Sequence, residues 1–222
     1  MSPGPTTGHT AKFRNASDDG RISSGLVTKN GPPVIKALEP LLCDKSGIAL
    51  EIGSGTGQHI LTFAAAFPQL KWHPSEPDPV HRTSIDAWRA HQVAPTGPAL
   101  DLDAASTWWH KADLIALGPL DLILSLNVIH ISPSITATRI LQGAADRLGS
   151  GGLVAFYGPF SEHGAHTGEG NAEFDRRLRA ENPDWGLRDT RDLTEIAQDS
   201  GLDPHALIPM PANNRLLVFC RP

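Results

Sequence analysis

A glycine-rich segment at residues 49–59, ALEIGSGTGQH, carries the residue types and spacing that point most directly to chemistry. Gly53, Gly55 and Gly57 alternate between an apolar run and the start of a helical pattern. Glycine allows a positive φ and lets a ligand touch the backbone where a Cβ would block it. The dinucleotide pattern G-x-G-x-x-G, in which a pyrophosphate binds the helix N-terminus, would need glycine at position 58, which is Gln.

Glu51 precedes the first glycine by two residues, and its charge discriminates between ligands. A carboxylate there would repel a pyrophosphate, whereas it would suit the ammonium group of a methionine moiety, directly or through water. We therefore interpret the loop as a site for S-adenosylmethionine, with a nicotinamide or flavin nucleotide and a purely structural turn as alternatives. The expected cofactor-binding residues of the loop are Glu51, Gly53, Ser54, Gly55, Gly57 and Gln58.

Acidic residues also follow the next two predicted strands. Glu76 comes about twenty residues after the loop, where an acid hydrogen-bonds ribose hydroxyls in doubly wound folds. Asp78 competes for that role, and Pro77 fixes the turn between them. Asp101 ends the third strand and could accept a hydrogen bond from an adenine amino group, with the Leu102 backbone beside the ring. Each acid alone is more often a solvated turn residue than a ligand, but three successive strand ends favour a common site.

Candidate catalytic residues follow the fourth and fifth predicted strands. His130 could be a general base, since its unperturbed pKa lies near neutrality, or it could hydrogen-bond within the strand–helix turn. Asn127 could orient the cofactor or the substrate through its amide. Tyr157 could face a sulfonium with its ring or hydroxyl, or it could pack in the core.

The interval from about 158 to 190 breaks the alternation of strands and helices, and we interpret it as a lid. Arg188 could clamp a substrate carboxylate in bidentate fashion, or it could pair with nearby acids and merely pin the lid. We expect Tyr157, Arg188 and Asn214 to line one acceptor pocket. The full set of expected substrate-binding residues is His130, Tyr157, Phe160, Asn171, Trp185, Arg188, Asn213 and Asn214.

The elements that must position these residues follow a βα alternation. Apolar runs predict strands, helical patterns separate them, and a hairpin closes the chain. This pattern predicts a Rossmann-like, doubly wound, mostly parallel seven-stranded sheet with a C-terminal antiparallel hairpin. Ligands of such sheets bind at the carboxyl ends of the strands. The predicted strands are 48–52, 70–74, 99–102, 120–126, 152–157, 207–210 and 216–220, and the predicted helices are 57–67, 80–91, 133–148, 171–180 and 192–200.

The first 22 residues are polar and rich in Pro, Gly and Thr, so we expect a flexible tail before a single domain over 23–222. A helical preface is expected between Ser23 and Leu42, broken at the pair Pro32-Pro33.

The net charge of −5 over 222 residues argues against a nucleic-acid partner, which would need a basic face. No apolar run reaches the length that spans a bilayer, and no signal peptide is recognisable, so we expect a cytoplasmic protein that does not bind membranes. The two cysteines, Cys43 and Cys220, have no metal-ligand spacing, and no metal is expected. The oligomeric state is left open.

At this point the sequence resembles the methyltransferase-like protein 26 family, formerly a domain of unknown function within the class I methyltransferases. The resemblance covers about residue 26 to the C-terminus. It departs near the N-terminus, where the family usually has Arg-Asn and this chain has Lys29-Asn30. The matching strings are LEIGSGTGQH, WHPSEPD, LDLD with Trp108, LILSLNVIHI, YGPF, NAEFD, WGLRD and MPANN.

The resemblance implies a methyltransferase that binds S-adenosylmethionine, with Lys29 and Asn30 added to the cofactor-binding residues. Together with the loop, it predicts transfer of a methyl group to an O or N atom of a small polar molecule, with His130 and Tyr157 as the catalytic candidates. The alternatives are a catalytically silent cofactor-binding interaction module and, less favoured, a nicotinamide-dependent oxidoreductase.

Overall fold

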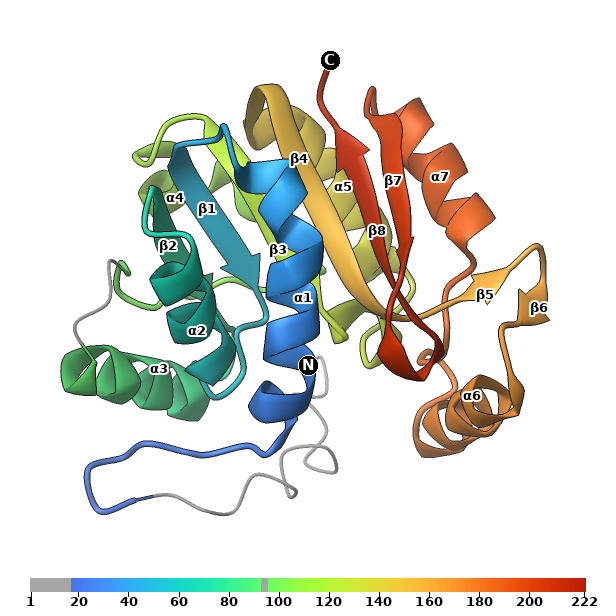
Figure 1. Ribbon diagram of the computed structural model, residues 1–222, viewed down its shortest axis with the longest axis horizontal. Helices are drawn as coiled ribbons and strands as arrows, with labels where there is room; N and C mark the ends of the chain where they lie inside the picture. Colours follow the sequence, from blue (N-terminus) through green and yellow to red (C-terminus); the bar gives the residue numbers. More distant parts are fainter. Residues whose placement is uncertain (1–16, 93–95) are drawn as a thin grey trace.

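A computed structural model describes residues 17–92 and 96–222, and its centre is a mixed six-stranded sheet (Figure 1). The strand order is β2-β1-β3-β4-β8-β7. The first four strands in this order are parallel, whereas β8 pairs antiparallel with both β4 and β7. The strand bounds are β1 Gly47–Ile52, β2 Leu70–Ser75, β3 Leu120–Leu126, β4 Leu148–Pro159, β7 Asp203–Pro209 and β8 Asn214–Cys220.

The predicted Rossmann-like sheet and its C-terminal hairpin are confirmed, but the predicted count of seven strands is wrong for the described residues. The segment expected as a strand at 99–102 makes one isolated bridge to β2, at Leu100, and a second bridge lies before it, at Thr96. Gly97 N and Leu100 N donate to carbonyls of β2, with an irregular spacing. Pro74 of β2, whose carbonyl faces this segment, has no N–H to donate back, so a regular ladder cannot form.

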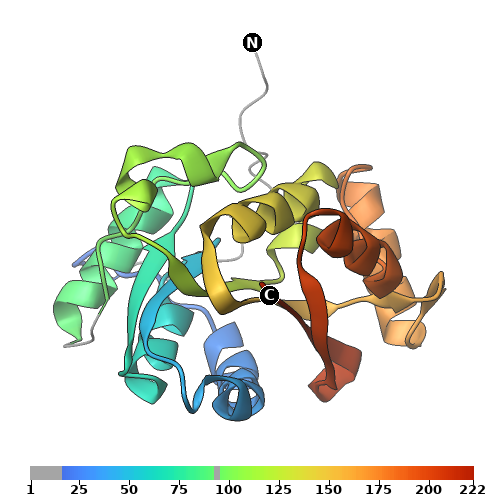
Figure 2. The same cartoon turned by 90° about the horizontal axis from the view of Figure 1, so that it is seen from above.

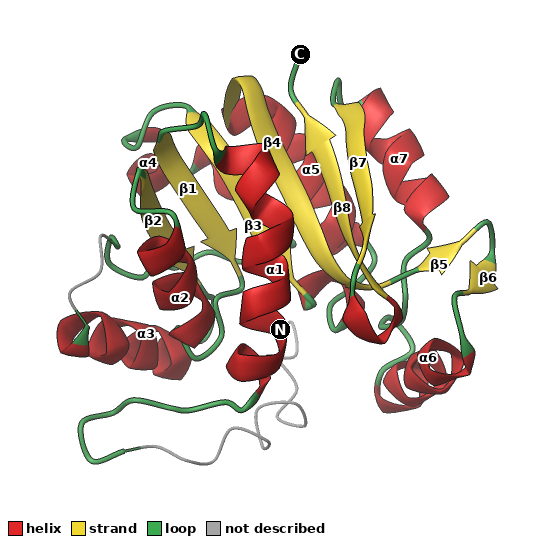
Figure 3. Cartoon of the chain, viewed as in Figure 1, coloured by secondary structure: helices red, strands yellow, loops and turns green. Residues whose placement is uncertain are grey.

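Helices cover both faces of the sheet (Figures 2 and 3). On one face lie α1 (Leu26–Leu42) and α2 (Gln58–Ala66), with α3 (Pro79–His91) beside α2. On the other lie α4 (Ala112–Ile115), α5 (Ile135–Arg147) and α7 (Thr190–Asp199). Two apolar clusters, one on each face, bury the inner strands. This explains why β3 is apolar almost throughout.

The N-terminal preface is one continuous helix, and the break expected at Pro32-Pro33 does not occur. Proline's fixed φ is compatible with a helix, so the cost is the lost N–H donors and the crowding of each ring against the carbonyl four residues earlier. Val34, Leu38 and Leu42 are fully buried against the sheet and favour the continuous helix. Of the expected tail, residues 1–16 lie outside the described residues.

The carboxyl ends of β1 to β4 meet at the lower edge of the sheet in Figure 1. The lid interval contains the small hairpin of β5 (Ser161–Glu162) and β6 (Ala165–His166) and the helix α6 (Glu169–Glu181). Short helical turns η3 (Val128–His130) and η4 (Pro211–Asn213) follow β3 and precede β8. The residues that could carry chemistry therefore gather at one edge. The remaining short turn, η2 (Trp108–His110), precedes α4.

Candidate functional site

The glycine loop turns sharply from β1 into α2, and all three of its glycines have positive φ. A Cβ on Gly53 would lie 2.4 Å from Val128 Cγ2, and one on Gly57 would lie 2.7 Å from the Ile85 Cα. These two glycines are needed for packing. Gly55, with φ +54°, would place its Cβ in open space, with no atom of the described part of the chain within 4 Å. The loop backbone is therefore open at Gly55, where a ligand could approach it, and packed at Gly53 and Gly57.

Glu51 is buried at the end of β1, and its Oε2 has no hydrogen-bond partner within the described residues. Burial raises the pKa of this carboxyl to about 7, and the nearby Glu76 contributes in the same direction. A buried carboxylate oxygen without a partner destabilises the fold by about 1–3 kcal/mol or more, so its presence at the carboxyl edge of the sheet needs an explanation. A ligand cation or N–H donor would provide one.

Glu76 contacts the glycine loop directly. Its Oε2 accepts a hydrogen bond from Gly55 N at 3.0 Å, and its Oε1 accepts one from Asp78 N at 3.3 Å. Each carboxylate oxygen keeps a second lone pair, so ribose hydroxyls could still donate to it. Asp78 has a different role in the structure, because its side chain caps α3 by accepting from Val80 N at 2.8 Å.

Asp101 lies further from the buried acids, with a side chain that is 67% exposed. It forms an ion pair with Arg82 Nη1 at 3.2 Å. Arg82 also donates to the carbonyls of Glu76 and Pro77, so it joins two of the expected cofactor segments. The Leu102 side chain is buried in the core.

Sequence reasoning missed Arg82 and His81. His81 Nδ1 lies 3.9 Å from Glu76 Oε1, and the Glu76 carboxyl raises the pKa of its imidazole. Asp78 and Pro79 mark the start of α3, and His81 and Arg82 lie in its first turn. This helix start, directly after Glu76, was the usable signal.

Two of the expected cofactor-binding residues, Gln58 and Asn30, form hydrogen bonds with other parts of the chain. Gln58 Oε1 accepts from Ser24 N at 2.5 Å, so its amide oxygen binds the chain that precedes α1. Lys29 is exposed on α1. Its neighbour Asn30 points toward β4, where the Tyr157 hydroxyl donates to its Oδ1 at 3.3 Å.

Tyr157, Asn30 and Asn214 form a chain of hydrogen bonds across three elements. The Tyr157 hydroxyl donates to Asn30 and accepts from Asn214 Nδ2 at 2.9 Å. Burial raises the pKa of the Tyr157 hydroxyl, which keeps its proton. Tyr157 and Asn214, two of the three residues expected to line one acceptor pocket, are therefore hydrogen-bonded to each other, and both of the hydroxyl's neighbours are neutral.

The turn before β8 is held by the lid. Ala212 and Asn213 both have left-handed backbone, with φ of 58° and 56°. Such residues cost about 1–2 kcal/mol each unless Gly or Asn occupies the position. Asn171 Nδ2 donates to Asn213 O at 3.2 Å and to Thr167 Oγ1 at 2.8 Å. Asn171 therefore contacts Asn213 and holds the turn in which the next residue, Asn214, lies beside Tyr157.

His130 is buried in η3, with only 1% of its surface exposed. Neither ring nitrogen has a hydrogen-bond partner within the described residues, and burial lowers the pKa of the imidazole to about 3. The ring packs edge-on against Phe160 at 5.1 Å between centroids. A Cβ on Gly158 would lie 2.6 Å from His130 Nε2 and 3.0 Å from Asn127 Oδ1. Gly158 therefore makes room for both side chains.

Arg188 is not part of the Tyr157 chain. Its guanidinium donates to the carbonyls of Ile129, Ser132 and Asp184 at 2.7–3.0 Å. These contacts favour the interpretation that it pins the lid, although its partners are carbonyls rather than acids. Trp185 packs with the lid residues Leu178 and Leu187, which is a core role.

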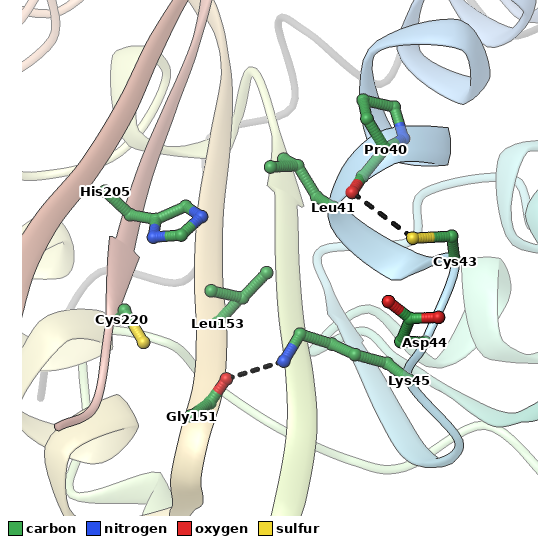
Figure 4. A pocket seen from close by; sticks show the side chains of 9 residues that line it. All are labelled: Pro40, Leu41, Cys43, Asp44, Lys45, Gly151, Leu153, His205 and Cys220. Carbon is green, nitrogen blue, oxygen red and sulfur yellow. Dashed lines mark hydrogen bonds between the residues drawn. The ribbon is translucent and has the colours of Figure 1, made fainter.

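The one pocket drawn in Figure 4 lies at the opposite, amino edge of the parallel strands. It has a volume of about 290 Å³. Lys45 crosses it to donate to Gly151 O at 2.7 Å. Its lining is remote from the glycine loop and consists of Pro40, Leu41, Cys43, Asp44, Lys45, Gly151, Leu153, His205 and Cys220.

Within residues 17–92 and 96–222, no three His, Cys, Asp or Glu side chains gather as a metal site would require. In the same part of the chain, no helix is long and apolar enough to cross a membrane.

Several solved structures of methyltransferases have a similar fold. The mitomycin 7-O-methyltransferase matches with a TM-score of 0.70 at 16% identity over 89% of this chain and 54% of that one. An O-methyltransferase family protein from Burkholderia thailandensis matches with 0.69 at 14% identity over 88% and 57%. Human N-acetylserotonin methyltransferase, solved in complex with S-adenosylmethionine, matches with 0.70 at 12% identity over 88% and 52%.

These likenesses define the class of the fold, which is that of the Rossmann-like methyltransferases. The chain spans little more than half the length of the structures it matches. It belongs to a family described as a protein of unknown function (DUF938), whose model matches residues 23–221.

Proposed function

We propose that the chain binds S-adenosylmethionine at the glycine loop and transfers its methyl group to an O or N atom of a small polar acceptor. The observation that carries the proposal is the buried Oε2 of Glu51, which has no hydrogen-bond partner in residues 17–92 and 96–222. The ammonium group of the cofactor's methionine moiety would pair with it. The open side of Gly55 leaves room for the cofactor beside the backbone, and Glu76 would accept from the ribose hydroxyls.

When bound, the cofactor supplies an electrophilic methyl group on a sulfonium sulfur. The chain's own residues have to align the acceptor with it and exclude water, and positioning alone can lower the barrier substantially. Tyr157 and Asn214, at the end of β4 and the start of β8, are proposed to bind the acceptor. Their neutral hydrogen-bonding groups suit a polar, uncharged acceptor atom.

His130 is proposed as the group that receives the acceptor's proton. Its imidazole is neutral, because burial lowers its pKa to about 3, so a ring nitrogen can accept a hydrogen bond. A group with so low a pKa is a weak base toward a free hydroxyl. The acceptor atom becomes far more acidic as its bond to carbon forms, and the proton can then move to the imidazole.

The structural likenesses support this proposal, because the mitomycin enzyme is a 7-O-methyltransferase. The proposal includes a closer relationship to the methyltransferase-like protein 26 family, a cytoplasmic location, and an acceptor that is not a nucleic acid. The burial of His130 favours a second candidate, a cofactor-binding module without transfer activity. In that case the acceptor side would stay closed.

Calorimetry with S-adenosylmethionine and S-adenosylhomocysteine tests the cofactor, with NAD as the control ligand. We expect micromolar binding of both sulfur compounds, and weaker binding to Glu51→Gln and Glu76→Ala. Binding of NAD alone would overturn the proposal in favour of an oxidoreductase. Binding without transfer of a radiolabelled methyl group to any of a panel of small hydroxyl and amine acceptors would favour the silent module.

A further inference from the structure

Backbone carbonyls in and after the turn that contains His130 accept hydrogen bonds from the lid. Gly186 N donates to the His130 carbonyl at 3.0 Å. Arg188 Nε donates to the Ile129 carbonyl at 2.9 Å, and Arg188 Nη2 donates to the Ser132 carbonyl at 2.7 Å. Carbonyls at the end of a helical turn have no partner within the turn, so donors from outside must satisfy them. For η3, these donors come from one short segment of the lid.

That segment is itself firmly tied within the lid. Arg188 also donates to the Asp184 carbonyl at 3.0 Å. Leu187 N donates to Asp175 Oδ1 at 2.7 Å, and Asp175 forms an ion pair with Arg179 at 3.1 Å. Arg188 therefore bridges two structures that are each internally bonded, the lid and the turn after β3.

The imidazole is surrounded by an aromatic side chain, by backbone and by the Asn127 amide, whose Oδ1 lies beside the same glycine as His130 Nε2. Phe160 packs on the ring, and Gly158 lies against its Nε2. The charged groups that act on the ring are Arg188, which lowers its pKa, and Asp175, which raises it, while burial has the largest effect. Both ring nitrogens lack a partner within the described residues, so a ligand that reaches the ring would complete its hydrogen bonding.

We propose that Arg188 is a positioning residue for His130: it binds the carbonyl groups on both sides of the histidine and holds the imidazole at the carboxyl end of β3 while the lid is docked. This inference rests on the proposed function, in which His130 receives the acceptor's proton. The guanidinium suits this role because its donors form a rigid, planar fork that can bridge two carbonyls at once. A lysine at the same position would keep the charge without the fork.

The experiment uses the full chain and does not depend on an acceptor. Side-chain nitrogen spectra of the histidines give the ionisation of His130, whose signal is identified by its loss in His130→Gln. Amide hydrogen exchange of residues 128–132 gives the stability of the turn. Arg188→Gln and Arg188→Lys are compared with Arg191→Gln, a control in which a neighbouring exposed arginine loses its pair with Glu195.

In Arg188→Gln we expect exchange in 128–132 to become about tenfold faster and the titration of His130 to move up by about one pH unit. In Arg188→Lys we expect the faster exchange with little change in titration. Arg191→Gln should change neither. Wild-type exchange in a folded Arg188→Gln would overturn the inference. If that variant does not fold, wild-type exchange in Arg188→Lys would overturn it.

Failure of the proposed function has a different signature. Wild-type chain that binds no S-adenosylhomocysteine would remove the methyltransferase proposal while leaving the exchange and titration results unaffected. Conversely, intact cofactor binding with no effect of Arg188 on residues 128–132 would remove only the positioning role.

Discussion

The Tyr157 hydroxyl lies 2.9 Å from Asn214 Nδ2, and this contact joins β4 to the turn that begins β8. The same hydroxyl donates to Asn30 on α1. Three segments that lie far apart in the sequence thus meet at one phenol. The acceptor side of the proposed site therefore carries one hydroxyl and two side-chain amides, whose donors and acceptors are fixed by these two hydrogen bonds.

The first prediction concerns this contact. Tyr157→Phe should lower the free energy of unfolding by about 1 kcal/mol, because a net hydrogen bond contributes about that amount and the ring remains. Asn214→Ala should have a similar effect, and the double variant should cost less than the sum of the two. Urea unfolding of all four proteins measures this coupling. Strict additivity would show that the two side chains do not stabilise each other.

The second prediction concerns the pH dependence that Glu51 introduces. Burial raises its pKa from 4.5 to about 7, so the folded state binds a proton more tightly than the unfolded chain does. The free energy of unfolding should therefore fall as the pH rises from about 4.5 to about 7, by at most about 3 kcal/mol from this group. Glu51→Gln should remove this slope in thermal or urea unfolding.

Cofactor affinity should depend on the same group in the opposite direction. In the proposed site the ammonium of S-adenosylhomocysteine would pair with ionised Glu51, so binding should tighten as the pH rises toward 7 and level off above it. Calorimetry at pH 6, 7 and 8 measures this, and Glu51→Gln should give a flatter profile. An identical pH profile in the wild type and the variant would contradict pairing between Glu51 and the ammonium.

The third prediction separates two glycines of the loop. Gly57→Ala should destabilise the fold by about 2–4 kcal/mol, because its Cβ would meet the Ile85 backbone at 2.7 Å. Gly55→Ala meets nothing within 4 Å and should cost only about 1–2 kcal/mol for its positive φ. Its methyl group would project into the proposed cofactor site, so its affinity for S-adenosylhomocysteine should fall more than its stability. Unimpaired binding by folded Gly55→Ala would place the cofactor elsewhere.

The fourth prediction distinguishes two neighbouring acids. Asp78→Ala removes the N-cap of α3 and should lower the unfolding free energy by about 1 kcal/mol while cofactor affinity is kept. Glu76→Ala should lose affinity, because it removes the group that accepts from Gly55 N and that would, in the proposed site, accept from the ribose hydroxyls. Thermal unfolding and calorimetry on both variants test the pair. A larger loss of affinity in Asp78→Ala than in Glu76→Ala would reverse the assignment.

Much of the architecture followed from local pattern. The apolar run of β3, the alternating glycines before α2 and the hairpin around Pro211 are each determined by residues adjacent in the sequence. Periodicity and backbone freedom are local properties, so they can be recognised without the fold. The local prediction was wrong at 99–102, where Pro74 on the neighbouring strand has no N–H for the ladder, and at Pro32-Pro33, where packing on the sheet outweighs the lost donors.

The partners of the site residues were decided by the tertiary structure. The residue types identified Glu51, Tyr157 and Arg188 as candidates, but nothing in their neighbourhood in the sequence indicated which groups they would meet. Asn214 meets Tyr157 across 57 residues, and Arg188 meets Ile129 across 59. Hydrogen bonds and burial depend on distances between segments, and only the packed sheet, helices and lid set those distances.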